Sequence, residues 1–237
     1  MVNLNYKTKT IPKILGGHTR NCLEIGRELY GSSIDEIISV SSTKVAEMTK
    51  LLENIHRAVN IGLINEMKIV ADKMNIDIHE VINAASTKPF GFTPYYPGPG
   101  LGGHCIPIDP WFLVENTKSG ELVRLARKIN DVRPNIVAQQ AVEQLQSVGG
   151  NKIGILGVAY KANVDDCRET PADAILAYLQ SAGIEVRYHD PYVPTWDCSR
   201  VNSVEELDDW ADTLILVTDH TCYANLNVQA PLLNTRA

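Results

Sequence analysis

Short apolar strands alternating with capped helices in the last third of the chain constrain its fold more than any other feature. The expected strands are "KIGILGVAY" (152–160), "IEVRYHDP" (184–191) and "DTLILVTDH" (212–220). Between the first two, Thr170 can N-cap a helix, Pro171 takes the favoured first helical position, and Gly183 can end it. Ser203 and Glu206 form a possible capping box for the next helix. This order predicts a doubly wound parallel sheet.

The rest of the chain predicts a helical centre behind a small α/β block. Residues 42–76 contain no proline and one interior glycine, and apolar residues recur there at helical spacing. Further helices are expected at 78–87 and 121–148, where Pro134 starts a fresh helix or kinks the existing one. Residues 12–42 predict strand, helix and strand, which cannot close a core by themselves. We therefore interpret this first block as the last piece of something larger.

Composition excludes several classes of function. The 237 residues carry a formal net charge of −6 and no run of Lys or Arg, which argues against a nucleic-acid partner. No apolar stretch is long enough to span a bilayer, and the N-terminus lacks the apolar core of a signal peptide. The five cysteines are scattered, with no metal-ligand spacing. We expect a reduced, cytoplasmic protein with free thiols, no membrane partner and no metal.

The segment "PGPGLGGHCIPIDP" (97–110) contains the strongest chemical signal. Cys105 stands among glycines and prolines, which favour turns over regular elements. A free cysteine is most often a small buried thiol. Here, however, Gly102 and Gly103 allow close approach of a ligand, and His104 and Asp109 supply an imidazole and a carboxylate nearby. Thiol, imidazole and carboxylate together favour a covalent nucleophile with acid–base support.

Other segments give weaker signals. Lys50 and Asn54 are four residues apart on the long helix and share a face, which is equally typical of a solvated polar surface. In "GILGVAYKANVDDCRE" (154–169), a glycine-bearing turn between strand and helix precedes Lys161 and Arg168, which can neutralise phosphate. The full dinucleotide fingerprint is absent, so plain packing of strand and helix is the alternative.

Three segments together resemble one known family. They are "AEMTKLLENIHRAVNIGLINE" (46–66), "GPGLGGHCIPIDP" (98–110) and "GVAYKANVDDCRETPA" (157–172). They resemble, in the family's own order, the UDP-sugar 6-dehydrogenases, which use two NAD+ to oxidise a nucleotide sugar to its uronic acid. The resemblance implies that Cys105 forms a thiohemiacetal and then a thioester. It also implies that Lys50 stabilises the oxyanion, Asn54 helps position water, and Asp109 assists proton transfer.

The resemblance also implies binding residues and a substrate class. The residues expected on the substrate side are Tyr95, Tyr96, Pro97, Gly98, Gly102 and Lys161. Gly103 and Arg168 are expected on the side of the NAD cofactor. Family members that act on UDP-glucose usually carry Ser and Lys where this chain has His104 and Ile108. This departure is similar to the branch that oxidises UDP-N-acetylhexosamines. It leaves UDP-N-acetylglucosamine and UDP-N-acetylmannosamine both open, with UDP-glucose as an alternative.

The resemblance finally implies a domain organisation. Residues 1–42 resemble a remnant of the NAD-binding Rossmann domain, 43–148 the helical central domain, and 149–237 the Rossmann-like UDP-sugar-binding domain. Because no predicted strand of the chain is followed by a GxGxxG motif, we expect a fragment that lacks most of the NAD domain and is inactive alone. We expect a homodimer through the central helix. The alternatives are a non-catalytic module for UDP-sugar binding or dimerisation, and a purely structural helical domain.

Overall fold

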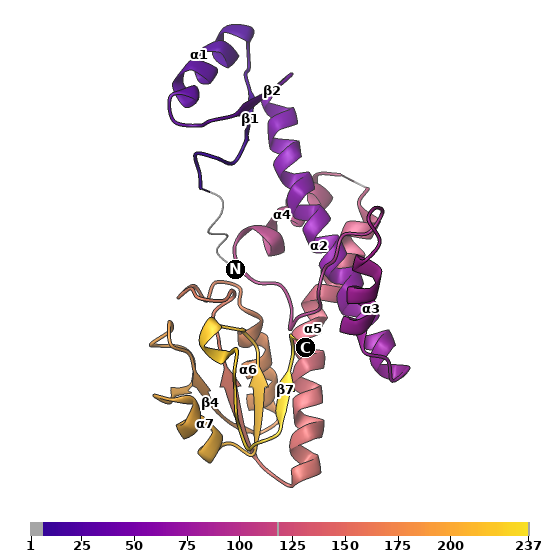
Figure 1. Cartoon of the computed structure of the whole chain (residues 1–237), viewed down its shortest axis with the longest axis vertical. Coiled ribbons are helices and arrows are strands. Elements are labelled where there is room, and N and C mark those ends of the chain that lie inside the picture. The colour runs from indigo at the N-terminus through magenta and orange to yellow at the C-terminus, as the bar shows by residue number, and fades with distance from the viewer. Residues whose placement is uncertain (1–6, 118, 237) are drawn as a thin grey trace. The chain divides into compact units, whose positions relative to one another are not determined.

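The computed structural model describes residues 7–117 and 119–236, which divide into two compact units between His56 and Arg57. The first unit contains β1 (Lys13–Gly16), α1 (Arg20–Gly31) and β2 (Ile37–Val40), and its two strands pair in parallel. The predicted strand, helix and strand are therefore confirmed. Helix α2 (Thr43–Lys73) begins in this unit and ends in the second (Figure 1). The three-domain division stays a prediction.

Helices make up the first half of the second unit. After α2 come α3 (Ile78–Ser86), α4 (Cys105–Asn116) and α5 (Glu121–Val148). Helix α5 is assigned continuously through Pro134, so this proline does not start a fresh helix. Helix α4 was not expected, because the glycines and prolines of residues 97–110 favour turns over regular structure. Pro107 lies in the first turn of α4, where a backbone N–H needs no partner within the helix, so the helix accommodates it.

The second half of this unit is a parallel sheet with helices on both faces (Figure 1). Its elements are β3 (Lys152–Leu156), α6 (Pro171–Ser181), β4 (Glu185–His189), β5 (Ser199–Arg200), α7 (Val204–Trp210), β6 (Thr213–Leu216), the 3-10 turn η1 (Thr221–Tyr223) and β7 (Leu232–Asn234). The strand order is β5-β4-β3-β6-β7, and all four strand pairings among the described residues of this sheet are parallel. The predicted doubly wound α/β sheet after a helical centre is therefore confirmed.

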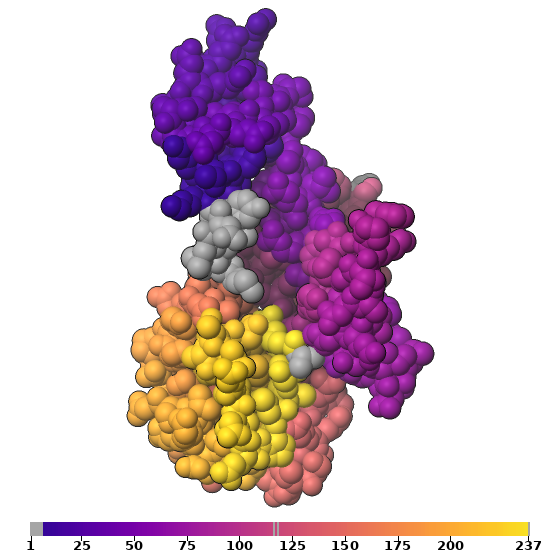
Figure 2. Space-filling view, viewed as in Figure 1, coloured from indigo at the N-terminus to yellow at the C-terminus, as the bar shows by residue number. Residues whose placement is uncertain are grey.

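Alternating side chains on the central strands separate two apolar cores. Ile153, Ile155 and Ile215 pack with residues of α5 and α6, whereas Leu156 and Leu214 pack with α7. All five are 0% exposed, and burial of each such side chain contributes about 1.5–3 kcal/mol. These cores join residues 150–236 and helix α5 into one packed body (Figure 2). That body fixes the loops at the carboxyl ends of the strands.

The helix-capping residues predicted from the sequence for α6 and α7 are the ones observed. Thr170 accepts a hydrogen bond from Ala172 N, and Ser203 accepts one from Glu206 N. The Glu206 carboxylate bonds back to Asn202 N, one residue before the expected capping-box partner. Within residues 7–117 and 119–236, no helix is long and apolar enough to cross a membrane. The same residues contain no cluster of three or more His, Cys, Asp or Glu able to hold a metal ion.

Candidate active site

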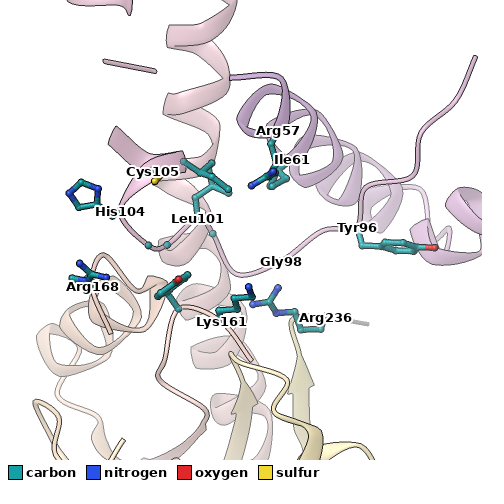
Figure 3. Close-up of a pocket in the computed structure, with 15 residues that line it drawn as sticks. Arg57, Ile61, Tyr96, Gly98, Leu101, His104, Cys105, Lys161, Arg168 and Arg236 are labelled. Carbon is teal, nitrogen blue, oxygen red and sulfur yellow. The ribbon is translucent and has the colours of Figure 1, made fainter. Parts of the chain in front are cut away.

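A cavity of 520 Å³ lies in the second unit, between its helical half and the sheet (Figure 3). This volume is typical of a site for a small organic ligand. Helix α2, the segment before α4, the loop after β3, and the residues after β7 all contribute to its wall. The lining residues are Arg57, Ile61, Tyr96, Gly98, Gly100–Ile106, Tyr160, Lys161, Arg168 and Arg236. Segments far apart in the sequence therefore meet at the cysteine motif.

Cys105 lies at the wall of this cavity as the first residue of α4, and its side chain is exposed. The free backbone N–H groups of the first helical turn, with the helix dipole, favour an anion at this end. His104 precedes it and also lines the cavity. Asp109 lies one turn further along α4, partly buried, and is not a lining residue. The helix thus places Asp109 on the same face as Cys105.

The other described thiols differ from Cys105 in environment. Burial raises the pKa of the Cys167 thiol to about 11 and that of Cys198 to about 12, so both are protonated at neutral pH. Burial also raises the pKa of Cys222. A hydrogen bond from the Thr19 hydroxyl lowers the pKa of the Cys22 thiol, which belongs to the first unit. None of these four described cysteines lines the cavity.

Glycine is required at positions 102 and 103 because other parts of the protein pack closely against them. A Cβ on Gly102 would lie 2.7 Å from Tyr160 Cβ and 2.8 Å from the Glu169 carbonyl oxygen. Gly103 has φ +84, and a Cβ there would lie 2.8 Å from the Tyr160 ring. The Gly103 N–H donates to the Arg168 carbonyl at 3.0 Å. The two glycines therefore let the cysteine segment dock directly on the loop that follows β3.

The residues predicted on the substrate side divide into two groups. Tyr96, Gly98, Gly102 and Lys161 line the cavity. Tyr95 instead packs partly buried against an apolar cluster of α2 and α3, and Pro97 is buried without reaching the cavity wall. Both predicted cofactor residues, Gly103 and Arg168, are lining residues. The structure thus brings most of the predicted set together around one space.

A buried polar network fixes the backbone at Gly98. The Gly98 N–H donates to Asn65 Oδ1 at 3.0 Å, and Arg133 Nε donates to the Gly98 carbonyl at 3.0 Å. Asn65 Nδ2 also donates to Asn130 Oδ1 at 3.0 Å. Asn65, Asn130 and Arg133 are each at most 2% exposed. These positioning residues were not predicted, because nothing local in a single sequence marks a contact between helices.

Cationic side chains surround the cavity although the whole chain carries a net charge of −6. The sequence predicted Lys161 and Arg168 but missed Arg57 on α2 and Arg236 near the C-terminus. Figure 3 shows Lys161 and Arg236 on the sheet side and Arg57 on the helix side. Asp166 pairs with Arg168 at 2.6 Å. This distribution makes the cavity suitable for an anionic ligand with more than one charged or polar group.

Arg236 is held by the loop that follows β6. Its Nε donates to the Val217 carbonyl at 3.2 Å, and it lies 3.8 Å from the Asp219 carboxylate. Burial lowers the pKa of the Arg236 guanidinium, which nevertheless stays charged at neutral pH. Arg236 is the penultimate residue of the chain, outside any recognisable motif. Only the folding of β7 against β6 brings it to the cavity.

Lys50 and Asn54 belong to the first unit, on the part of α2 before Arg57. The Lys50 Nζ donates to Asn54 Oδ1 at 3.3 Å and lies 3.6 Å from Glu53 Oε2. Asn54 is 1% exposed, whereas 61% of the Lys50 side chain is exposed. The two side chains therefore share a face of α2, as predicted, and are also hydrogen-bonded to each other. Their role beside Cys105 and Asp109, which belong to the second unit, stays a prediction.

Comparison with known proteins identifies the family. Residues 44–132 match the central domain of the UDP-glucose/GDP-mannose dehydrogenase family, and residues 154–235 match the UDP binding domain of the same family. The chain belongs to this family. The cavity lies where these two family domains meet, since its lining residues come from both matched segments and from Arg236.

Several similar proteins are named UDP-N-acetylmannosamine dehydrogenases. The UDP-N-acetyl-D-mannosamine dehydrogenase of Methanococcus aeolicus is 39% identical over 215 residues, which are 90% of this chain and 49% of that protein. That of Methanocaldococcus jannaschii is 38% identical over 91% of this chain and 50% of the relative. The solved UDP-D-ManNAc dehydrogenase of Pyrococcus horikoshii has TM-score 0.87 and 32% identity, covering 96% of this chain and 56% of that one. The chain spans about half the length of the relatives it matches.

Proposed function

We propose that this chain forms the substrate-binding and covalent-catalysis half of an NAD-dependent UDP-N-acetylhexosamine 6-dehydrogenase. The single observation that carries the proposal is the cavity in which an exposed thiol, Cys105, lies among cationic side chains from both family domains. A nucleotide sugar needs cations for its diphosphate and a nucleophile at its reacting carbon. Membership of the dehydrogenase family supports the reaction class.

The substrate we propose is UDP-N-acetylmannosamine. The names of the relatives from Methanococcus aeolicus and Methanocaldococcus jannaschii support this epimer, which the sequence analysis left open. Lys161 and Arg236 bind the diphosphate at the sheet side of the cavity. The sugar then extends toward Cys105 between the Gly100–Gly103 segment and Arg57. The alternative, a module that binds the nucleotide sugar without catalysis, uses the same cavity but needs no thiol.

Covalent catalysis proceeds on the C6 atom of the sugar. The C6 alcohol loses a hydride and a proton to become an aldehyde, and the Cys105 thiolate adds to C6 to give a thiohemiacetal. Loss of a second hydride leaves a thioester, and water displaces Cys105 to give the carboxylate. The first turn of α4 stabilises the oxyanion, and Asp109 accepts and returns protons. For Lys50 and Asn54 the proposal rests on the family resemblance alone, which implies that Lys50 stabilises the oxyanion and Asn54 helps position the water.

NAD, the proposed cofactor, supplies the two-electron acceptor for both oxidations when bound. Asp166 engages Nε and Nη2 of Arg168, while the Arg168 side chain is 69% exposed at the cavity wall. This held but accessible guanidinium fits a contact to a cofactor phosphate. Gly103 is buried beneath Tyr160, and we propose that it contributes to the cofactor side through its backbone alone.

Calorimetric titration of the 237-residue chain with UDP-N-acetylmannosamine, UDP-N-acetylglucosamine, UDP-glucose and NAD+ tests the proposal. We expect saturable binding of UDP-N-acetylmannosamine, at least about tenfold tighter than UDP-glucose, because the sugar contacts discriminate between the two. A chain that binds none of the three nucleotide sugars would exclude the proposed site. Equal affinity for the three nucleotide sugars would contradict the proposed substrate class, although membership of the family would stand.

Replacing Arg236 by alanine is expected to weaken UDP binding by about 10- to 100-fold, the effect of removing a charge-assisted hydrogen bond to phosphate. Titration with UDP measures the change. Arg236→Lys should recover part of the affinity, since it keeps the charge but loses the planar fork. Arg20→Ala is the control, because Arg20 is an exposed residue of α1 outside the cavity. Unchanged UDP affinity in Arg236→Ala would remove Arg236 from the proposed diphosphate site.

We further propose that the chain forms a homodimer through α2. Leu63, Met67 and Val70 follow one stripe of α2 and are 51%, 39% and 42% exposed, and Met74, directly after the helix, is 63% exposed. A second copy of the same stripe is the partner that would cover it symmetrically. The Met67→Lys variant should shift the protein from dimer to monomer in analytical ultracentrifugation, because a charge would be buried in the interface. The control is Lys68→Met, a change at the neighbouring position. A monomeric wild type would contradict the proposal.

A further inference from the structure

Lys161 projects into the cavity from a short stretch of backbone, residues 159–163, which we name the lysine arch. The arch follows β3 and precedes the segment that carries Arg168. Lys161 lies at its centre and is partly buried at the cavity wall. The position of its ammonium group therefore depends on how the two ends of the arch are held.

The first end is fixed by a buried carboxylate. Asp190, which is 0% exposed at the end of β4, accepts hydrogen bonds at Oδ2 from Val158 N at 2.8 Å and Ala159 N at 3.2 Å. The Thr218 hydroxyl donates to the Ala159 carbonyl. Both backbone polar groups of Ala159 are thus satisfied by buried side chains from neighbouring strands.

The second end is fixed by a histidine on that same carboxylate. The Asn163 N–H donates to His220 Nδ1 at 2.8 Å, and His220 Nε2 lies 2.9 Å from Asp190 Oδ2. Because Nδ1 accepts a hydrogen bond, the network assigns the ring proton to Nε2, which donates to Asp190. His220 is therefore neutral here and is 1% exposed. One buried pair, Asp190 and His220, holds both ends of the arch.

Asn163 has a conformation that needs this support. Its φ of +62 is in the left-handed region, which asparagine tolerates better than most residues. Its side chain bonds to Thr221 twice, through Nδ2 to the Thr221 hydroxyl at 2.7 Å and through Oδ1 from the Thr221 N–H at 3.0 Å. The sharp turn that ends the arch is thus locked to the η1 segment that contains Thr221.

We propose that His220 is a positioning residue for Lys161. It acts as a neutral hydrogen-bond acceptor that fixes the end of the lysine arch. The fixed arch then orients the ammonium group of Lys161 toward the diphosphate of the nucleotide sugar. This inference rests on the proposed function for its ligand, but the fixation of the arch is a property of the chain itself. His220 does not line the cavity, so its effect on the ligand would pass through Lys161.

Two substitutions at His220 separate its two hydrogen bonds. His220→Gln can keep a donor toward Asp190, because the glutamine amide reaches the place of Nε2, but it removes the acceptor for Asn163 N–H. His220→Asn places an amide oxygen near Nδ1 and can keep that acceptor, while losing the donor to Asp190. The matched control is His189→Gln. His189 is buried in the same region and contacts the Tyr223 hydroxyl at 2.9 Å, without touching the arch.

Amide hydrogen exchange and titration with UDP test the inference on the full 237-residue chain. In His220→Gln we expect exchange at the Asn163 amide to accelerate about tenfold or more beyond any global change, and UDP affinity to fall about tenfold. His220→Asn should restore most of both values, and His189→Gln should leave the Asn163 amide unchanged relative to its global stability. Circular dichroism and melting temperature report whether each variant folds.

The outcomes distinguish this inference from the proposed function. If Asn163 exchange is unaffected in a folded His220→Gln variant, His220 does not fix the arch and the inference is overturned, whether or not UDP binds. If exchange accelerates but UDP affinity stays at the wild-type value, His220 fixes the arch without positioning Lys161, which also overturns it. If wild type does not bind UDP, the proposed function and the role assigned to Lys161 fail together, while the exchange data still decide whether His220 holds the arch.

Discussion

Replacing Cys105 by serine is expected to abolish formation of the uronic acid, by about 10⁴-fold or more, in an enzyme that contains this chain and its NAD-binding half. An effect of this size is typical of removing a covalent nucleophile from a site whose other groups remain. Serine is nearly isosteric with cysteine, and Cys105 is exposed at the cavity wall, so the fold should not change. Affinity for the UDP-sugar should stay within about threefold, because the diphosphate contacts are untouched. Reduction of NAD+ and calorimetric titration measure the two quantities.

Cys22→Ala is the matched control for this experiment. The Cys22 thiol has a lowered pKa and is therefore the described cysteine most able to compete as a nucleophile. It belongs to the first unit and does not line the cavity. We expect wild-type turnover in Cys22→Ala. Normal turnover in Cys105→Ser would refute the assignment of the nucleophile, and loss in both variants would indicate a general effect on the fold.

The sheet was predictable because its signals are local. The cap at Thr170, the proline at 171 and the glycine at 183 stand within a few residues of the elements they bound, and all three occupy the expected places. The apolar runs of β3, β4 and β6 are likewise contiguous in the sequence. The edge strands β5 and β7 span two and three residues, too short for any periodicity to be recognised.

Helix α4 and part of the candidate site were not predictable for physical reasons. Two prolines argue against a helix at α4: Pro107 lies in its first turn, which the sequence pattern cannot tell from a loop, and Pro110 lies in its interior, where proline is normally unfavourable. Arg57 and Arg236 reach one cavity from positions 179 residues apart, the difference between 236 and 57. Two residues so distant in the sequence are brought to one cavity only by folding. The thiol itself was predictable, because its glycines and prolines form a local motif.

The pair Asp190 and His220 illustrates the same limit. Asp190 directly follows β4 and His220 lies four residues after β6, two strands that were correctly predicted, yet nothing in either segment indicates that the side chains meet. Strands β4 and β6 flank β3, and the carboxyl ends of parallel strands lie at one edge of a sheet, so both segments lead to loops at the same edge. Only the structure shows that His220 Nε2 and Asp190 Oδ2 lie 2.9 Å apart.

Replacing Asp190 by asparagine is expected to lower the free energy of unfolding by about 3–5 kcal/mol. Among the described residues, five groups donate to this carboxylate, namely the N–H groups of Val158, Ala159, Tyr192 and Val193, and His220 Nε2. An amide has one acceptor oxygen, and its NH2 group would face donors that are left buried without a partner. Urea denaturation followed by circular dichroism measures the loss.

The pH dependence gives this prediction a second readout. Burial opposes ionisation of Asp190, but hydrogen bonds from His220, Val158 N and Tyr192 N outweigh it and hold the pKa of the carboxyl below its ordinary value. A lowered pKa in the folded state contributes stability above the unfolded value of about 3.9, and this contribution is lost as pH falls through the folded pKa. The stability difference between wild type and Asp190→Asn should therefore be full near pH 7 and shrink below about pH 4. The exposed Asp209→Asn change on α7 is the control and should alter stability by less than about 0.5 kcal/mol at either pH. A difference that stays constant down to pH 3 would show that the variant acts through shape and not through the charge of Asp190.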